Sequence, residues 1–207
     1  VDLDLGDLDR VFDILRAESF LAAFDMPKAE DPERFGTHVA TNVELGRGFT
    51  LRDRAWAHAE QTRALRAFNR LMENFDLILL PTSPLSPFPW TQSHPTRIDG
   101  TAMDIYYRWL ALTYRSSLFG GPSITLPAGQ DAAGMPFGLQ ALGPVRGDVD
   151  LLSAARTLEA ILARSPQTRP VPPDLEKTLR IPADLRSIVT HPPLSAPPPS
   201  APAPAAR

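Results

Sequence analysis

Residues 118–142 read LFGGPSITLPAGQDAAGMPFGLQAL, and this stretch decides the fold. It holds two short apolar runs, Ser123–Pro127 and Phe137–Leu142, on either side of a turn rich in Gly and Asp. Gly and Pro bound both runs, which is typical of strands and not of helices. The stretch therefore predicts two short strands joined by a tight connection.

Helical patterns dominate the sequence before this stretch. Residues 7–24 carry apolar side chains at helical spacing and predict an amphipathic helix. Residues 26–47 are polar and contain two prolines, which indicates a loop with at most a short helix. Thr50 and Asp53 then form a capping-box pattern that opens a long helix to about Asn74.

Further elements follow on both sides of the deciding stretch. Asp76–Leu80 is a continuous apolar run stopped by a proline, which predicts a buried strand. Ile98–Tyr114 predicts a helix that carries aromatic side chains inward, and Asp148 predicts the N-cap of a helix to about Arg164. The order helix, strand, helix, strand, strand, helix indicates the α/β class, with a mixed β-sheet flanked by helices.

Composition bounds the functions open to this chain. Its 207 residues, 43% of them hydrophobic, suffice for one large domain or two small ones. The net charge of -3 gives no field that attracts nucleic acid or anionic lipid, and no apolar run is long enough to span a membrane. The absence of cysteine excludes disulfides and thiolate chemistry. The first ten residues are acidic and do not form a secretory signal, so we expect a cytoplasmic protein. We interpret the four acids of this start as a solvated face: Asp2, Asp4, Asp7 and Asp9.

The character of the chain changes near its end. Residues 1–175 form the predicted domain, and residues 176–207 form a tail rich in Pro and Ala. Such a composition cannot bury a core, so we expect the tail to be disordered from about His191.

Three segments, taken in order, resemble the C-terminal part of the amidase signature family. They are Phe75–Pro84 (FDLILLPTSP), Thr113–Gly129 (TYRSSLFGGPSITLPAG) and Gly134–Gln140 (GMPFGLQ). The resemblance covers roughly residues 10–175 and implies the C-terminal portion of that family's fold. It departs from the family pattern at Ser117, where the family has Asn.

The resemblance implies a hydrolase that cleaves carboxylic amides through a serine acyl-enzyme. In the family, a second serine on a cis peptide relays the proton of the nucleophile to a neutral lysine. The chain has only two lysines, Lys28 and Lys177, and both lie in polar segments beside prolines. Ser116 and Ser117 imitate a nucleophile loop but stand in the wrong order relative to the glycines, so we expect no catalytic residue in this chain.

The same resemblance suggests a substrate pocket. In the family, the helix before the Asn-Leu-x-Gly segment helps to wall the acyl cavity, which makes Tyr106, Trp109, Leu110 and Thr113 candidate substrate-binding residues. Glutamine-using amidotransferases of the family carry an acid where this chain has Leu110, and Arg63 matches an arginine that would hold the substrate carboxylate. Because an apolar side chain cannot pair with an ammonium group, we expect a neutral or aryl amide instead of glutamine.

The sequence thus predicts the C-terminal part of an amidase-type hydrolase, inactive by itself, with a small-molecule amide as substrate once the missing N-terminal part completes it. We expect no cofactor and no metal, because the four histidines are scattered and make no metal pair. A homo-oligomer and a split-enzyme partner both remain open as assemblies. Two other readings also remain open: a non-catalytic interaction protein on the same fold, and a truncated gene product without a function of its own.

Overall fold

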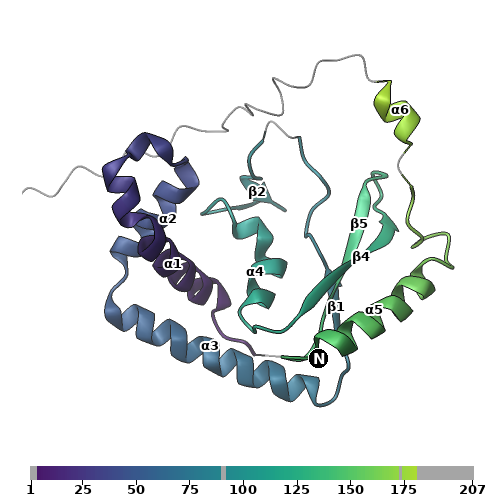
Figure 1. The fold of residues 1–207 in the computed structure, drawn as a ribbon, viewed down its shortest axis with the longest axis horizontal. Helices are drawn as coiled ribbons and strands as arrows, with labels where there is room; N and C mark the ends of the chain where they lie inside the picture. The colour runs from purple at the N-terminus through teal and green to yellow at the C-terminus, as the bar shows by residue number, and fades with distance from the viewer. Residues whose placement is uncertain (1–3, 90–91, 173, 181–207) are drawn as a thin grey trace, which may run out of the picture. The chain divides into compact units, whose positions relative to one another are not determined.

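The computed structural model describes residues 4–89, 92–172 and 174–180, which form two compact units (Figure 1). The larger unit contains residues 4–87 and 110–174, and the smaller contains residues 88–109 and 175–180. The predicted disorder after His191 lies outside the described residues, and the predicted boundary near residue 175 stays a prediction.

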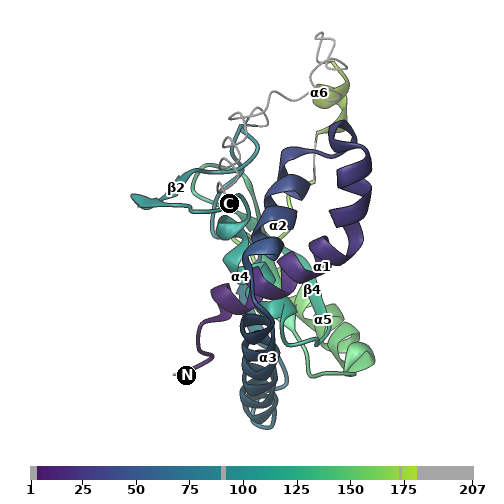
Figure 2. The same cartoon turned by 90° about the vertical axis from the view of Figure 1, so that its left-hand side faces the viewer.

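Three helices open the larger unit: α1 (Leu8–Glu30), α2 (Thr37–Gly48) and α3 (Leu51–Met72), with a short 3-10 turn at Pro32–Arg34. The predicted loop over residues 26–47 is wrong, because α1 continues through Pro27 and α2 occupies twelve residues. Helix α2 lies against α1 (Figure 2). A Cβ on Gly46 would lie 2.7 Å from the Ala17 carbonyl oxygen, so the glycine lets the two helices approach closely.

Helix α3 begins as the sequence predicts. The Thr50 hydroxyl accepts from the backbone N–H of Asp53 at 3.2 Å, and the Asp53 carboxylate accepts from the backbone N–H of Thr50 at 3.0 Å. This reciprocal capping box satisfies two donors that the first helical turn leaves free. Further along, Ala64 and Phe68 are buried, so one face of α3 belongs to the core.

A three-stranded sheet follows, in the order β1–β5–β4, with both pairings antiparallel. Strand β1 is Ile78–Pro81, β4 is Ser123–Gln130 and β5 is Pro136–Leu142, which confirms the α/β class and the two strands of the deciding stretch. The prediction that β1 is buried is wrong: it forms an edge of this sheet, and Leu79 is 48% exposed.

Two helices cover the sheet. Helix α5 (Asp148–Leu162) runs along β4 and β5 (Figure 1), and it buries Leu151 and Ala155. Its N-cap is Gly147 and not the predicted Asp148, which instead occupies the first turn. Helix α4 (Ala111–Ser117) leads into Leu118 and Phe119, whose buried side chains join the main core. There the rings of Phe68 and Phe119 stack with centroids 4.6 Å apart.

The smaller unit contains a two-stranded hairpin, β2 (Arg97–Ile98) with β3 (Thr101–Ala102), and the short helix α6 (Leu175–Leu179). The helix predicted over Ile98–Tyr114 is therefore wrong in its first half. Asp99 and Gly100 both have positive φ, 46° and 79°, as a tight hairpin turn requires. Helical structure resumes only in the 3-10 turn Arg108–Leu110.

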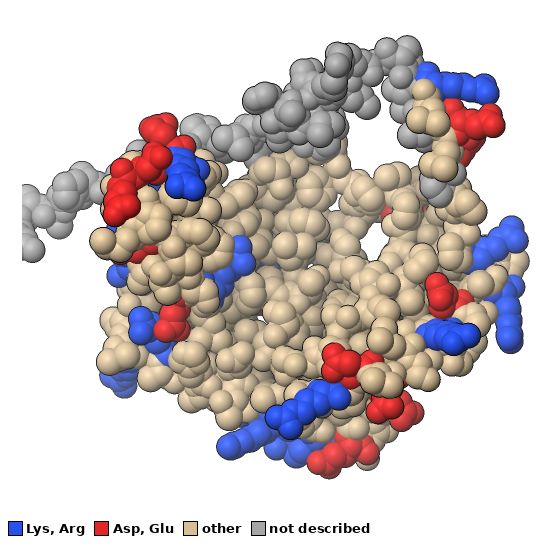
Figure 3. Space-filling model, in the orientation of Figure 1, with Lys and Arg blue, Asp and Glu red and all other residues tan. Residues whose placement is uncertain are grey.

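On the face drawn in Figure 3, both positive and negative side chains occur along the lower edge and the right edge of the molecule. Among the described residues, no helix combines the length and the apolar character needed to cross a membrane.

Candidate functional site

The three family-like segments meet on one face of the sheet, beneath α4. The strand register places Leu80 and Thr125 on either side of Gln140, so these side chains share a face. Helix α4 sits over that face: the Thr113 hydroxyl donates to the Thr82 carbonyl oxygen at 3.3 Å, and Gln140 Nε2 donates to Ser116 Oγ at 3.3 Å. We call these four residues, together with Thr125, whose hydroxyl lies beside that of Thr82, the polar seam: Thr82, Thr113, Ser116, Thr125 and Gln140.

Because Gly138 has no side chain, Thr82 and Thr125 of the seam can approach each other beside β5. The hydroxyl of Thr82, just after β1, lies 3.3 Å from that of Thr125 in β4, and both side chains lie beside Gly138 of β5. A Cβ on Gly138 would lie 2.9 Å from Thr82 Oγ1 and 3.1 Å from Thr125 Cγ2. Gln140 is only 4% exposed, and its Oε1 atom has no hydrogen-bond partner. Gln140 is thus the buried end of the seam, whereas Thr113 and Thr125 are exposed to solvent.

Among the described side chains, the hydroxyl of neither serine of α4 makes a hydrogen bond to a basic group. Ser116 Oγ donates to the Thr113 carbonyl oxygen and Ser117 Oγ to the Tyr114 carbonyl oxygen, each at 2.7 Å. A main-chain carbonyl accepts a hydrogen bond but does not take up a proton, whereas a serine nucleophile needs an adjacent base. Lys28 lies in the last turn of α1, which is a different part of the larger unit.

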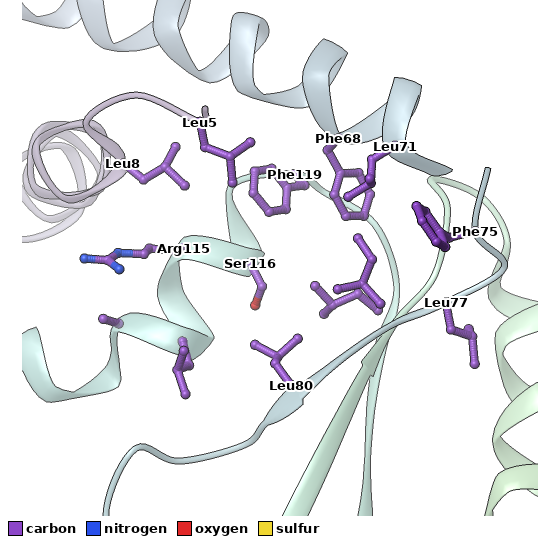
Figure 4. A pocket seen from close by; sticks show the side chains of 14 residues that line it. Leu5, Leu8, Phe68, Leu71, Phe75, Leu77, Leu80, Arg115, Ser116 and Phe119 are labelled. Atoms are coloured by element: carbon purple, nitrogen blue, oxygen red, sulfur yellow. The ribbon is translucent and has the colours of Figure 1, made fainter. Parts of the chain in front are cut away.

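A cavity of about 440 Å³ opens between α3, β1, α4 and the segment that leads into α1. Figure 4 shows the side chains that line it, and all but two are apolar. We call this cavity the apolar cleft; its walls include Leu5, Phe68, Leu71, Phe75, Leu77 and Leu80. Its two polar residues are Arg115 and Ser116.

Asp9 holds Arg115 at the rim of this cleft. The carboxylate accepts from Nε and Nη2 of Arg115 at 2.7 Å each, and from the hydroxyl of Tyr114 at 2.7 Å. Hydrogen bonding from Arg115 to Asp9 raises the pKa of the guanidinium further above its usual value, so the pair is charged. The acidic start is therefore not simply a solvated face, because Asp9 ties α1 to α4 and Asp7 caps α1.

A second, polar cavity of about 380 Å³ adjoins the seam at Thr82. It lies between the loop after β1 and the turn that joins β4 to β5. Its acid is Asp131, which accepts from the hydroxyl of Ser86 and from the backbone N–H groups of Ala133 and Met135. These hydrogen bonds, that of Ser86 foremost, hold the pKa of Asp131 below its usual range. The acid therefore stabilises the turn as a carboxylate.

The predicted substrate-binding residues fall in different places. Thr113 lies in the seam and Leu110 just before α4, whereas Tyr106 and Trp109 belong to the smaller unit. There Tyr106 packs edge-on against its neighbour in sequence at 5.1 Å, and Trp109 meets an aromatic ring of the same unit at 5.3 Å. Arg63 pairs with Glu60 at 2.9 Å and does not line the apolar cleft.

Sequence reasoning missed Gln140 as a site residue. The signal was available, because Gln140 is a lone polar residue in an otherwise apolar strand and stands in phase with Leu142 of the core. The described part of the chain contains no group of three or more His, Asp or Glu side chains arranged to hold an ion.

Comparison with known proteins adds independent findings. A family model described as amidase matches residues 7–152. The chain is similar to the A subunit of a glutamyl-tRNA(Gln) amidotransferase from Clostridium acetobutylicum, with 33% identity over 70% of this chain and 30% of the relative. It is also similar to an acylamidase of Rhodococcus erythropolis, with 30% identity over 58% of this chain and 24% of that protein. A crystal structure of an amidase superimposes with a TM-score of 0.70 and 27% identity, over 78% of this chain and 37% of the other. The chain thus spans less than a third of the length of these two curated relatives.

Proposed function

Because this chain belongs to the amidase family, we propose that it is the C-terminal portion of an amidase-type hydrolase that cleaves carboxylic amides through a serine acyl-enzyme. In this proposal the chain supplies scaffold and pocket wall, and the serine nucleophile and its lysine base come from the portion that this chain does not match. The name of the acylamidase relative agrees with amide cleavage.

The polar seam is the observation that carries this proposal. Residues from all three family-like segments meet there, so the chain has the architecture of the family at this point. The hydroxyls of Ser116 and Ser117 donate to helix carbonyls, and no bond to a lysine is seen for them among the described side chains. A site with the family's walls and without an activated hydroxyl supports a pocket and not the cutting chemistry.

The candidate substrate residues remain proposals. Thr113 and Leu110 of the larger unit and Tyr106 and Trp109 of the smaller unit stay candidate substrate-binding residues, and Leu110 favours a neutral or aryl amide over glutamine. Arg63 would take a substrate carboxylate, and in the structure its Nε pairs with Glu60. We also place the complete enzyme in the cytoplasm.

The rival function is a non-catalytic binding protein on the same fold. The hydroxyls of Ser116 and Ser117, which donate to helix carbonyls, agree equally well with a binding protein. The two hypotheses therefore differ only in whether the chain, once joined to the missing portion, hydrolyses amides. An enzyme portion must confer turnover on the portion that carries the nucleophile, whereas a binding protein leaves amides intact in every assembly.

Ammonia release from simple primary amides tests the proposal. We expect no release above the uncatalysed rate from the purified chain, and release once the chain is joined to the N-terminal portion of an amidase-family fold. Turnover by the chain alone that disappears in Ser116→Ala or Ser117→Ala would overturn the assignment of scaffold and pocket wall. A completed protein that binds amides without releasing ammonia would favour the rival function.

A further inference from the structure

The apolar cleft is the most conspicuous surface of the larger unit that the site leaves unexplained. Its walls come from the C-terminal end of α3, from β1, from α4 and from the segment before α1. Several of its side chains remain in contact with solvent; Phe75, for example, is 46% exposed. Large contiguous apolar surfaces of this kind mark contacts with another molecule or with another part of a fold.

A small-molecule ligand fits this cleft poorly. Ligand pockets combine apolar walls with a few polar groups that fix the orientation of the ligand. Here the guanidinium of Arg115 is already held by both oxygens of Asp9, and the hydroxyl of Ser116 donates to a helix carbonyl. Figure 4 shows these two as polar members among leucine and phenylalanine side chains. The cleft therefore offers mainly apolar contact, and both of its polar residues already make hydrogen bonds within the chain.

We propose that the apolar cleft is the docking surface for an apolar segment of the N-terminal portion of an amidase-family fold. This inference rests on the proposed function and names the partner of the same molecule. The chain matches only 30% and 24% of the length of the two curated relatives, so most of such a fold lies outside it. Leu5 lines the cleft from the segment that leads into α1, so a portion placed ahead of α1 reaches the cleft directly.

The open edge of β1 supports this occupant. Strand β1 pairs only with β5 in the described sheet, and Leu79 is 48% exposed on the face opposite Ile78 and Leu80. Because an unpaired edge and an unfilled apolar face occur at the same strand, a single protein segment can satisfy both. A second copy of this chain would bring the same surfaces and an equal charge, and it is an outcome that the experiment distinguishes.

Two variants on α3 give a matched test. Leu71→Asp places a charge in the cleft wall near the end of the helix, whereas Leu51→Asp places the same charge at its first residue, where the side chain is 77% exposed. An acid in the first helical turn is favourable, so the control variant keeps its fold. Phe75→Asp is a second cleft variant at a position outside the helix, and circular dichroism of each variant verifies folding.

The experiment co-expresses the full chain with the N-terminal portion of the Rhodococcus erythropolis acylamidase, cut where its match to this chain begins. We expect a 1:1 complex on size-exclusion chromatography. Docking would bury the introduced carboxylate among apolar side chains. The affinity of the chain for the N-terminal portion should therefore fall at least about tenfold in Leu71→Asp and Phe75→Asp and stay unchanged in Leu51→Asp. Absence of a complex, equal binding by all variants, or a homodimer of the chain that the cleft variants dissociate would overturn the proposal.

A second measurement on the chain alone needs no partner. An anilinonaphthalene dye, which fluoresces in apolar surroundings, should bind the parent chain and Leu51→Asp but bind Leu71→Asp at least about threefold more weakly. Equal dye binding by folded Leu71→Asp would count against an open apolar cleft. If the complex forms and releases no ammonia, the docking surface stands and the proposed function fails, so the two failures are distinguishable.

Discussion

Replacing Asp9 by alanine tests whether the contact between α1 and α4 stabilises the wall of the apolar cleft. The carboxylate accepts three hydrogen bonds of 2.7 Å, two from Arg115 and one from Tyr114. Tyr114 is only 5% exposed, so the substitution removes this hydrogen bond inside the protein. The other two bonds lie nearer to solvent, because the side chains of Arg115 and Asp9 are 46% and 31% exposed.

These exposures set the magnitude. The loss of a buried hydrogen bond to a carboxylate costs about 1–2 kcal/mol, and a partly exposed ion pair contributes about 0.5–1 kcal/mol. We therefore expect Asp9→Ala to lower the free energy of unfolding by about 2 kcal/mol, equivalent to a fall in Tm of about 4–8 °C for a chain of this size. Asp76→Ala removes an exposed acid elsewhere and should change stability by less than about 0.5 kcal/mol.

Urea unfolding followed by circular dichroism measures both variants, and Tyr114→Phe completes a double-mutant cycle. Because the hydroxyl and the carboxylate share one hydrogen bond, the effect of Tyr114→Phe should nearly vanish in the Asp9→Ala background. Equal stability of Asp9→Ala and Asp76→Ala, or strictly additive effects of the two substitutions in the cycle, would refute the reasoning.

Three further predictions concern the fold. Gly129 and Gly134 both have positive φ, so alanine is strained at either position. A Cβ on Gly129 would also collide with the backbone after α5, whereas a Cβ on Gly134 would meet no atom within 4 Å. Thermal unfolding should therefore show that Gly129→Ala destabilises the fold clearly more than Gly134→Ala. Phe68→Ala empties a site that is 1% exposed and should cost about 3–5 kcal/mol in urea unfolding, and a loss below about 1 kcal/mol would contradict the packing described. The Thr50 hydroxyl foremost lowers the pKa of Asp53, so this acid stabilises the fold above its ordinary pKa near 4 and loses that contribution as pH falls through the lowered value. Asp53→Asn should therefore flatten the dependence of stability on pH in the acid range, and an unchanged slope would show that the capping box does not act through the ionised acid.

Local signals made much of the fold predictable. The capping box of α3 and the strands of the deciding stretch depend on residues close together in sequence, and the structure confirms them. The hairpin at Asp99–Gly100 was also encoded locally, by a dipeptide typical of tight turns, but the aromatic residues that follow suggested a helix instead. The helix prediction is wrong there because the Asp-Gly turn, and not the spacing of the apolar residues, determines the backbone.

Long-range packing explains the remaining differences. Helix α2 has a polar sequence, and it buries Asn42 and Val43 because Gly46 lets it cross α1 closely. The polar seam likewise joins Thr82, Thr113 and Gln140 across long stretches of sequence. No local pattern predicts those distances, although a lone glutamine in an apolar strand indicates where a buried polar contact lies.

Covalent labelling tests the central claim, that the cutting groups are not in this chain, most directly. A fluorophosphonate reacts with serine hydroxyls that an adjacent base has activated, and intact-mass spectrometry detects the adduct. The hydroxyls of Ser116 and Ser117 donate to main-chain carbonyls, so we predict that the purified chain keeps its unmodified mass. An adduct at either serine, lost on its replacement by alanine, would contradict the account.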